Sequence, residues 1–268
     1  MSFWFWHGLR RGIQSTRYPR APESARGITP GRPVDTNFAS AAEALQAAAQ
    51  CPVDAITSQG EQTFVDLAAC IHCQRCHFGG PRPLQWSGDF EWAQLPRVKD
   101  THDPLPGYFQ GSVHIMVVDA GDCGACLREV KQLNNPLYNM HRLGMFFTAT
   151  PRTADVLLVV GPVTTNMRGP LLKTYEAMPD PKRVLAAGTC AITGNIFGTT
   201  FASAGGLGTI LPVDLEIPGD PPPPLAILHS LLVVTGRKPP APRSNDQWTV
   251  RTQGPGCRRR GTDAVLNS

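Results

Sequence analysis

Three cysteines separated by two residues each are the feature that most constrains this chain. Cys70, Cys73 and Cys76 lie in the stretch CIHCQRC, and Cys51 stands further upstream, directly before a proline. Four cysteine thiolates hold a cubane iron–sulfur cluster, and Cys-x2-Cys-x2-Cys with a separate Cys-Pro is typical of such sites. The four cysteines therefore predict one [4Fe–4S] cluster with the polypeptide folded around it.

The same spacing indicates that a second cluster of this kind is missing. In two-cluster ferredoxins the pattern Cys-x2-Cys-x2-Cys-x3-Cys-Pro occurs twice, and each Cys-Pro serves the cluster of the other half. Counted in that register, the other triad would occupy Ala41, Ala44 and Ala47, and the second Cys-Pro would fall at Gly80–Pro81. All four ligands of one cluster are absent, while all four of the other remain. We therefore predict a ferredoxin-like α+β module over residues 39–92 that holds a single [4Fe–4S] cluster.

Zinc and disulfide bonds are the alternative uses of these cysteines. Zinc sites usually show two separated Cys-x2-Cys pairs rather than a triad with a Cys-Pro upstream. Disulfides suit small secreted domains, and the apolar run at the start of this chain is too short for a signal peptide. Thiolates must remain reduced to hold iron, which favours a cytoplasmic setting.

From residue 112 onward, apolar strand patterns alternate with helix patterns. Such alternation predicts a parallel sheet with helices on its faces, here a flavodoxin-like open sheet. Runs such as VLLVV suit strands that are covered on both sides. The expected strands are 113–120, 154–163, 182–188 and 211–219, and the expected helices are 125–134, 169–178 and 223–236.

Three further cysteines follow strands of this predicted sheet. Cys123 and Cys126 come after the first strand in DAGDCGACLREV, and Cys190 comes after the third in AAGTCAITG. Ligands of an open α/β sheet bind at the carboxyl ends of its strands. Two loops that meet at this edge would bring three thiolates together around a second metal cluster. The alternative is that these are small buried residues in strand–helix turns.

The residues around these cysteines resemble a known family. GDCGACLREV, RVLAAGTCAITGNIFG and EIPGDPPPPLAILHSLL are similar to the small, cluster-bearing subunit of membrane-bound energy-converting [NiFe] hydrogenases, including the formate hydrogenlyase type. They are also similar to its homologue in respiratory complex I. The form Cys-x2-Cys-x2-Glu, ending at Glu129, is nearer the hydrogenase pattern. GIQSTRYPR, CPVDAI and DLAACIHCQRC separately resemble the ferredoxin-like subunit of the same complexes, so two usually separate subunits are fused here.

The resemblance implies a second cluster with an altered ligand. The family's fourth ligand is a cysteine before the last helix, where this chain has Asp220 in Pro-Gly-Asp-Pro. Cys123, Cys126, Cys190 and Asp220 would then hold a [4Fe–4S] or a three-iron cluster. Two alternatives stay open, that Asp220 caps the following helix and that the site is empty.

The resemblance also implies what the protein does and with which partners. It indicates an electron-transfer subunit that catalyses no reaction itself and serves a large hydrogenase-like or complex I-like catalytic subunit. Integral membrane subunits are the other implied partners, which places the chain peripherally on the cytoplasmic side of the cell membrane. The alternative function is a scaffold subunit whose second site has lost or altered its redox role.

The remaining segments complete the expected domain organisation. Residues 1–38 form a docking segment and an extended linker, 93–111 a second linker, 112–238 the flavodoxin-like domain, and 239–268 a polar tail. The aromatic start FWFW is expected to dock on a membrane-embedded partner, with a lipid surface or the protein's own core as alternatives. No stretch approaches the roughly 18 apolar residues of a membrane span. A net charge of +4 gives no strong signal for nucleic acid.

Overall fold

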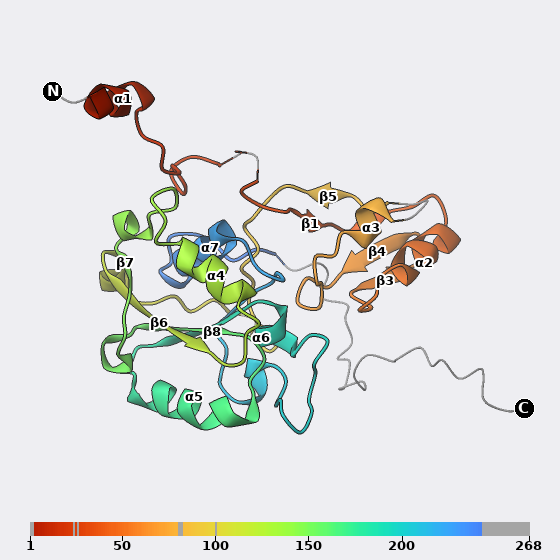
Figure 1. Ribbon diagram of the computed structural model, residues 1–268. Coiled ribbons are helices and arrows are strands. Elements are labelled where there is room, and N and C mark those ends of the chain that lie inside the picture. Colours follow the sequence, from red (N-terminus) through yellow and green to blue (C-terminus); the bar gives the residue numbers. More distant parts are fainter. Residues whose placement is uncertain (1–2, 24, 26, 80–82, 100, 243–268) are drawn as a thin grey trace, which may run out of the picture.

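The computed structural model describes residues 3–242 except 24, 26, 80–82 and 100. Gly80–Pro81 and most of the expected polar tail therefore lie outside the described residues. Figure 1 shows a larger α/β part, a smaller part beside it, and an N-terminal helix that stands away from both.

A five-stranded parallel sheet forms the centre of the larger part. Its strand order is β10-β9-β8-β6-β7, and every neighbouring pair is parallel. Because β6 comes first in the chain, this is the flavodoxin-like order, and the predicted fold class is confirmed. The edge strand β7 is not among the strands that the sequence predicts. The strands are β6 (Val113–Asp119), β7 (Met145–Phe147), β8 (Val156–Val160), β9 (Arg183–Ala187) and β10 (Leu215–Ile217).

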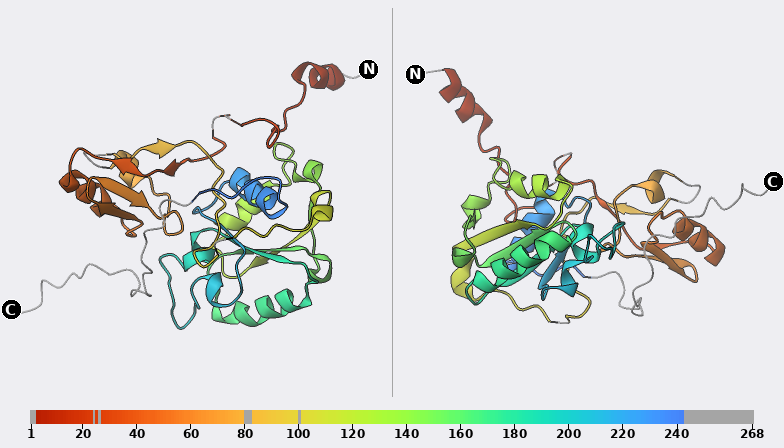
Figure 2. Two further views of the ribbon diagram at one scale, coloured as in Figure 1. Left: turned by 180° about the vertical axis from the view of Figure 1, so that it is seen from behind. Right: turned by 60° about the horizontal axis from the view of Figure 1, so that its bottom comes forward.

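Helices cover both faces of this sheet. Helices α4 and α7 lie on one face and α5 lies on the other (Figure 2). Strand β8 serves both faces, because Leu158 packs into the cluster that holds α7 while Leu157 packs into the cluster that holds α5. The helices are α4 (Ala125–Gln132), α5 (Thr165–Ala177), α6 (Thr189–Thr193) and α7 (Pro224–Val234), with 3-10 turns at Gly107–Gln110, Met140–Leu143, Pro151–Thr153 and Leu207–Thr209.

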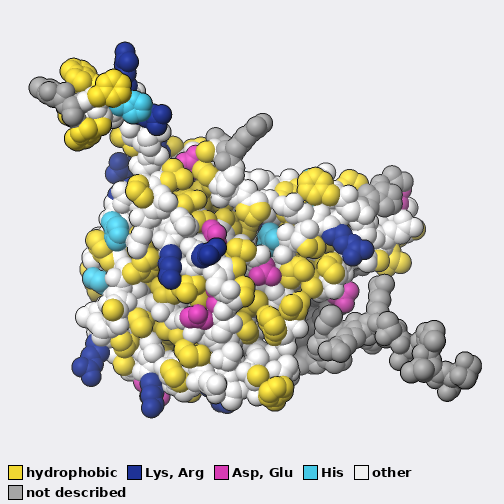
Figure 3. All heavy atoms as spheres, viewed as in Figure 1, with side chains coloured by type: hydrophobic (Ala, Val, Ile, Leu, Met, Phe, Trp, Pro, Cys, Tyr) yellow, Lys and Arg dark blue, Asp and Glu magenta, His cyan; other side chains and the backbone are white. Residues whose placement is uncertain are grey.

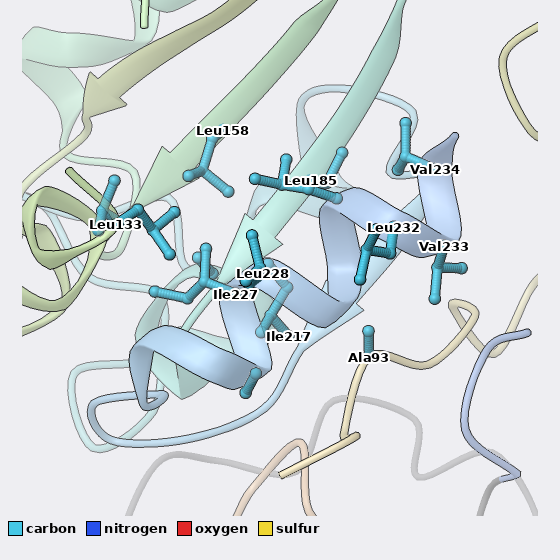
Figure 4. Packing of buried hydrophobic residues seen from close by; sticks show 14 of the residues in the cluster. Ala93, Leu133, Leu158, Leu185, Ile217, Ile227, Leu228, Leu232, Val233 and Val234 are labelled. Atoms are coloured by element: carbon cyan, nitrogen blue, oxygen red, sulfur yellow. The ribbon is translucent and has the colours of Figure 1, made fainter. Parts of the chain in front are cut away.

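Helix α7 is buried on all sides. Each of its residues is buried, and a helix without a polar face needs apolar cover all round. Figure 4 shows Leu158 and Leu185 of the sheet on one side of α7 and Ala93 on another. The backbone N–H of Leu105 donates to the carbonyl of Val234 over 2.7 Å. The segment expected as the second linker therefore packs on the α/β core.

The smaller part is an α+β unit built on a three-stranded antiparallel sheet of order β2-β4-β3. Its helix α2 begins with a Ser40 hydroxyl that accepts a hydrogen bond from the Glu43 N–H, at 3.3 Å. Ala44 and Ala47, where the missing cluster's ligands would stand, are fully buried in α2. The α+β composition is as expected, and the ferredoxin-like character stays a prediction. The elements are β1 (Arg32–Pro33), β2 (Thr36–Asn37), α2 (Ala41–Ala49), β3 (Ile56–Gln59), β4 (Gln62–Val65), α3 (Arg75–Phe78) and β5 (Trp86–Ser87).

Helix α1 (Phe3–Arg11) has no buried residue. Phe3 is 88% exposed and Trp4 is 75% exposed, so the helix does not dock on the protein's own core. Figure 3 shows its hydrophobic and basic side chains extending away from the body of the molecule. Among the described residues, none of the helices has both the length and the apolar character needed to span a membrane.

Candidate metal centres

The four cysteines of the predicted first site line one pocket in the smaller part. Cys51 follows α2, Cys70 and Cys73 lie in the loop before α3, and Cys76 lies within α3. All four are free thiols. The rest of the lining is mostly apolar and includes the side chain of Trp86. The structure thus brings Cys51 together with the three closely spaced cysteines that follow it further along the chain.

Left-handed backbone conformations shape the loops around this pocket. Asp54 has a φ of 53° and His72 has a φ of 50°, in a region that non-glycine residues rarely adopt. In these turns the Ala55 N–H donates to Cys51 Sγ at 3.2 Å, and the His72 N–H donates to Cys70 Sγ at 3.4 Å. Hydrogen bonds to sulfur are one of the means by which proteins set the potential of iron–sulfur sites.

Burial makes these thiols costly to ionise without a metal. It raises the pKa of Cys70 to about 12 and that of Cys76 to about 11, and the neighbouring cysteines add to both shifts. A cationic cluster removes this cost, because it binds the thiolates directly. In the described part of the chain, no three His, Cys, Asp or Glu side chains are arranged to hold a single metal ion. A cubane instead has one iron for each thiolate, so its ligands surround a larger group.

The second group of candidate ligands lies at the carboxyl edge of the parallel sheet. Cys123 and Cys126 follow β6, Cys190 lies in α6 directly after β9, and Asp220 follows β10. Burial raises the pKa of the Cys126 thiol, and the nearby charges of Asp122, Asp220, Cys190 and Cys123 raise it further. The structure therefore gathers the three predicted cysteines and the predicted aspartate in one neighbourhood.

The backbone is fitted closely around the Cys126 sulfur. Gly188 has a φ of +91°, and a Cβ atom at this position would lie only 2.6 Å from Cys126 Sγ. Gly219 has a φ of +135°, and its Cβ would lie 2.5 Å from the Cα of Pro222. Both positions therefore require glycine, because a side chain would clash with its neighbours and would also strain the backbone at these positive φ values.

Asp220 does not cap the last helix. Helix α7 has Pro223 at its N-cap and receives no capping hydrogen bond from a side chain, so the capping alternative is wrong. Instead the Asn195 amide donates to Asp220 Oδ2 at 3.0 Å and lies 3.6 Å from Cys190 Sγ. Burial raises the pKa of the Asp220 carboxyl, and Asp122 raises it further.

Asn195 is a site residue that the sequence analysis misses. Its one local signal is a left-handed conformation, with a φ of 48°, directly after a glycine. Asparagine tolerates that conformation better than most residues, so the turn explains the residue type but does not point to the site.

The loops that carry the two groups of cysteines meet where the smaller part touches the sheet edge. The Thr189 hydroxyl lies 3.1 Å from the carbonyl oxygen of Cys70. Beside this contact the ring of His72 stacks on Trp92, with centroids 5.0 Å apart and planes at 22°. Burial lowers the pKa of His72 to about 4, so its ring is neutral at pH 7.

Comparison with known proteins identifies relatives for the second half of the chain. Residues 123–234 match the family described as NADH ubiquinone oxidoreductase, 20 Kd subunit. An uncharacterized protein of Methanocaldococcus jannaschii is 42% identical over 123 residues, which cover 46% of this chain and 82% of that protein. A probable membrane-bound hydrogenase subunit of Pyrococcus furiosus is 40% identical over 116 residues, which cover 43% of this chain and 70% of that protein. Formate hydrogenlyase subunit 7 of Escherichia coli is 38% identical over 125 residues, which cover 47% of this chain and only 49% of that protein.

Thiol burial predicts the order in which a metal-free protein is alkylated. Only the thiolate reacts, so the raised pKa values leave Cys70 and Cys76 protonated at pH 8, whereas Cys73 and Cys123 are exposed. We expect iodoacetamide to label the exposed pair at least about tenfold faster, as measured by peptide mass spectrometry. Labelling of Cys76 should rise between pH 8 and pH 10.5, as the pH approaches its pKa. Equal rates at all four thiols would contradict this arrangement.

Proposed function

The chain belongs to the NADH ubiquinone oxidoreductase 20 Kd subunit family, and we propose that it is an electron-transfer subunit of a hydrogenase-like or complex I-like membrane complex. Its relatives include formate hydrogenlyase subunit 7 and a probable membrane-bound hydrogenase subunit. One observation carries the proposal. Two groups of candidate metal ligands lie in one chain, and a direct hydrogen bond joins the loops that bear them.

The first pocket would hold one [4Fe–4S] cluster through the thiolates of Cys51, Cys70, Cys73 and Cys76. A bound cluster of this kind accepts and releases one electron at a time. The residues of the chain supply the surroundings. The apolar lining limits access of water, and the amide donors to Cys51 and Cys70 stabilise negative charge on sulfur.

The second site would hold a cluster through Cys123, Cys126, Cys190 and Asp220. A carboxylate oxygen is a harder ligand than a thiolate, so one iron would be bound less firmly than the others. The Asn195 amide orients that carboxylate and also reaches the Cys190 sulfur. Either a four-iron cluster with one oxygen ligand or a three-iron cluster is compatible with this donor set.

We place the large catalytic subunit against the loop that follows α6. Three large apolar side chains are exposed there, Ile196 at 57%, Phe197 at 54% and Phe201 at 99%. Backbone hydrogen bonds to the start of α5 hold this loop, including Thr165 N–H to the Ala202 carbonyl at 2.9 Å. Exposed apolar side chains on an ordered loop beside a cluster site suit a protein partner.

We place the integral membrane subunits at α1. The helix exposes four aromatic side chains and carries Arg10 and Arg11 in its last turn. Aromatic and basic residues together suit the boundary between a membrane and the cytoplasm. The chain would then be a peripheral subunit on the cytoplasmic side of the membrane.

Single cysteine substitutions test the two sites independently. Cys51→Ala should lower the iron content by about four atoms per chain and remove one paramagnetic signal of the reduced protein, while the other signal persists. Cys126→Ala should remove the other signal and leave the first one in place, so each variant is the control for the other. Iron analysis and low-temperature electron paramagnetic resonance measure both effects. A wild-type protein that is isolated anaerobically with no iron in the second site would favour the scaffold function instead.

Ligand exchange at Asp220 tests the altered fourth position. Mild oxidation should remove one iron from the second site of the wild-type protein and leave a three-iron cluster, because oxygen binds iron less tightly than sulfur. Asp220→Cys should resist this treatment, and the four-thiolate first site is the internal control. Identical spectra and iron counts for the wild type and Asp220→Ala would remove Asp220 from the ligand set.

Deletion of residues 2–13 tests the docking role of α1. The shortened chain should move from the membrane fraction to the soluble fraction with its iron content unchanged, because the deleted residues lie far from both sites. A matched variant with Arg10 and Arg11 replaced by Gln separates two kinds of partner. It should remain on the membrane if the aromatic side chains enter a protein groove, and dissociate if anionic lipid is the main partner.

A further inference from the structure

Thr189 lies between the two candidate sites and is completely buried. It is the first residue of α6 and directly precedes Cys190. Its backbone N–H donates at 2.9 Å to the carbonyl of Gly219, which is the residue before Asp220. The main chain of Thr189 therefore ties together two of the segments that bear ligands of the second site.

The side chain of Thr189 extends this connection to the first site. Its hydroxyl lies 3.1 Å from the carbonyl oxygen of Cys70 and 3.2 Å from that of Gly219. A hydroxyl has one proton to donate. The Gly219 carbonyl already accepts the Thr189 N–H, so Cys70 is the acceptor that gains most from the hydroxyl.

A second threonine of α6 lies near the same loop. The Thr193 hydroxyl is 3.5 Å from the carbonyl oxygen of Ala68, but it lies closer, at 3.1 Å, to the Thr189 carbonyl of its own helix. Thr189 therefore supplies the shorter of the two hydroxyl contacts from α6 to the loop that leads into the first pocket.

We propose that Thr189 is a positioning residue that fixes the Cys70 loop of the first site against the Cys190 loop of the second, and that its hydroxyl completes the electron path between them. This inference rests on the proposed function. Between the sulfur atoms of Cys70 and Cys190 the path consists of covalent bonds and one hydrogen bond. Electronic coupling falls off less steeply along such a path than across a gap between unbonded atoms. With clusters bound in both sites, one would lose one electron as the other gains it, and no atom or proton would be transferred.

Three substitutions in the full-length chain test this role. Thr189→Val keeps the shape and removes the donor, whereas Thr189→Ser keeps the donor and removes only a methyl group. Thr235→Val is the matched control, because Thr235 is also buried and its hydroxyl donates to the Leu231 carbonyl at 3.0 Å, within the last turn of α7.

Hydrogen exchange followed by mass spectrometry measures the positioning role without reference to redox activity. Loss of one buried hydrogen bond should speed exchange in the peptides that contain the Cys70 loop and α6 by about five- to tenfold in Thr189→Val. Thr189→Ser and Thr235→Val should exchange like the wild type in these peptides. Equal exchange in Thr189→Val and the wild type, or equal acceleration in the Val and Ser variants, would overturn the positioning role.

Freeze-quench paramagnetic resonance measures electron transfer between the sites. Thr189→Val should transfer electrons more slowly than Thr189→Ser at equal iron content, because only the Val variant lacks the hydroxyl that contacts the Cys70 carbonyl. Equal rates in the Val and Ser variants would overturn the path. A wild-type protein with iron in only one site would refute both the path and the proposed function, whereas the exchange measurement would still decide the positioning role.

Discussion

The complete burial of helix α7 is the constraint on which the architecture depends. The helix is buried on all sides and mostly apolar, and the sheet can cover only one side of it. The chain that leads out of the smaller part supplies further cover through Trp92, Ala93 and Leu105, which belong to the same hydrophobic cluster. Gln94 then pairs with Glu216 and covers the free edge of β10. The smaller part is therefore held at the carboxyl edge of the sheet, where the second group of ligands lies.

The sequence predicts the central sheet well because its strands are short apolar runs covered on both faces. It does not predict β7 or α6, since three and five residues are too few to show a period. The candidate cysteine ligands can be identified because a cluster site requires a recognisable spacing of its cysteines. Thr189 and Asn195 cannot, because threonine and asparagine are common in turns and their partners are distant in sequence. Their roles follow from tertiary contacts alone.

The smaller part shows how folding and metal binding depend on each other. Its hydrophobic cluster is modest, with Ile56, Val65, Leu67 and Leu84 among its buried members, and the thiol of Cys76 belongs to it. Units of this size usually need a metal, a disulfide or a partner to be stable. A cluster would convert buried thiols into structural bonds. Helix α2 adds to this cluster through Ala47 and Ala48, and Ala47 stands where a ligand of the missing cluster would be.

The covalent continuity of the chain between the two sites has a kinetic consequence. Two separate carriers must first collide, and the frequency of that encounter depends on their concentrations and on salt. Here one chain carries both sites, and Trp92, Ala93 and Leu105 of the connection pack on the core, which gives each site a permanently high effective concentration of the other. Passage of an electron between them would then be a first-order event, insensitive to dilution and ionic strength. The stoichiometry of the two sites is likewise fixed at one to one by the synthesis of a single polypeptide.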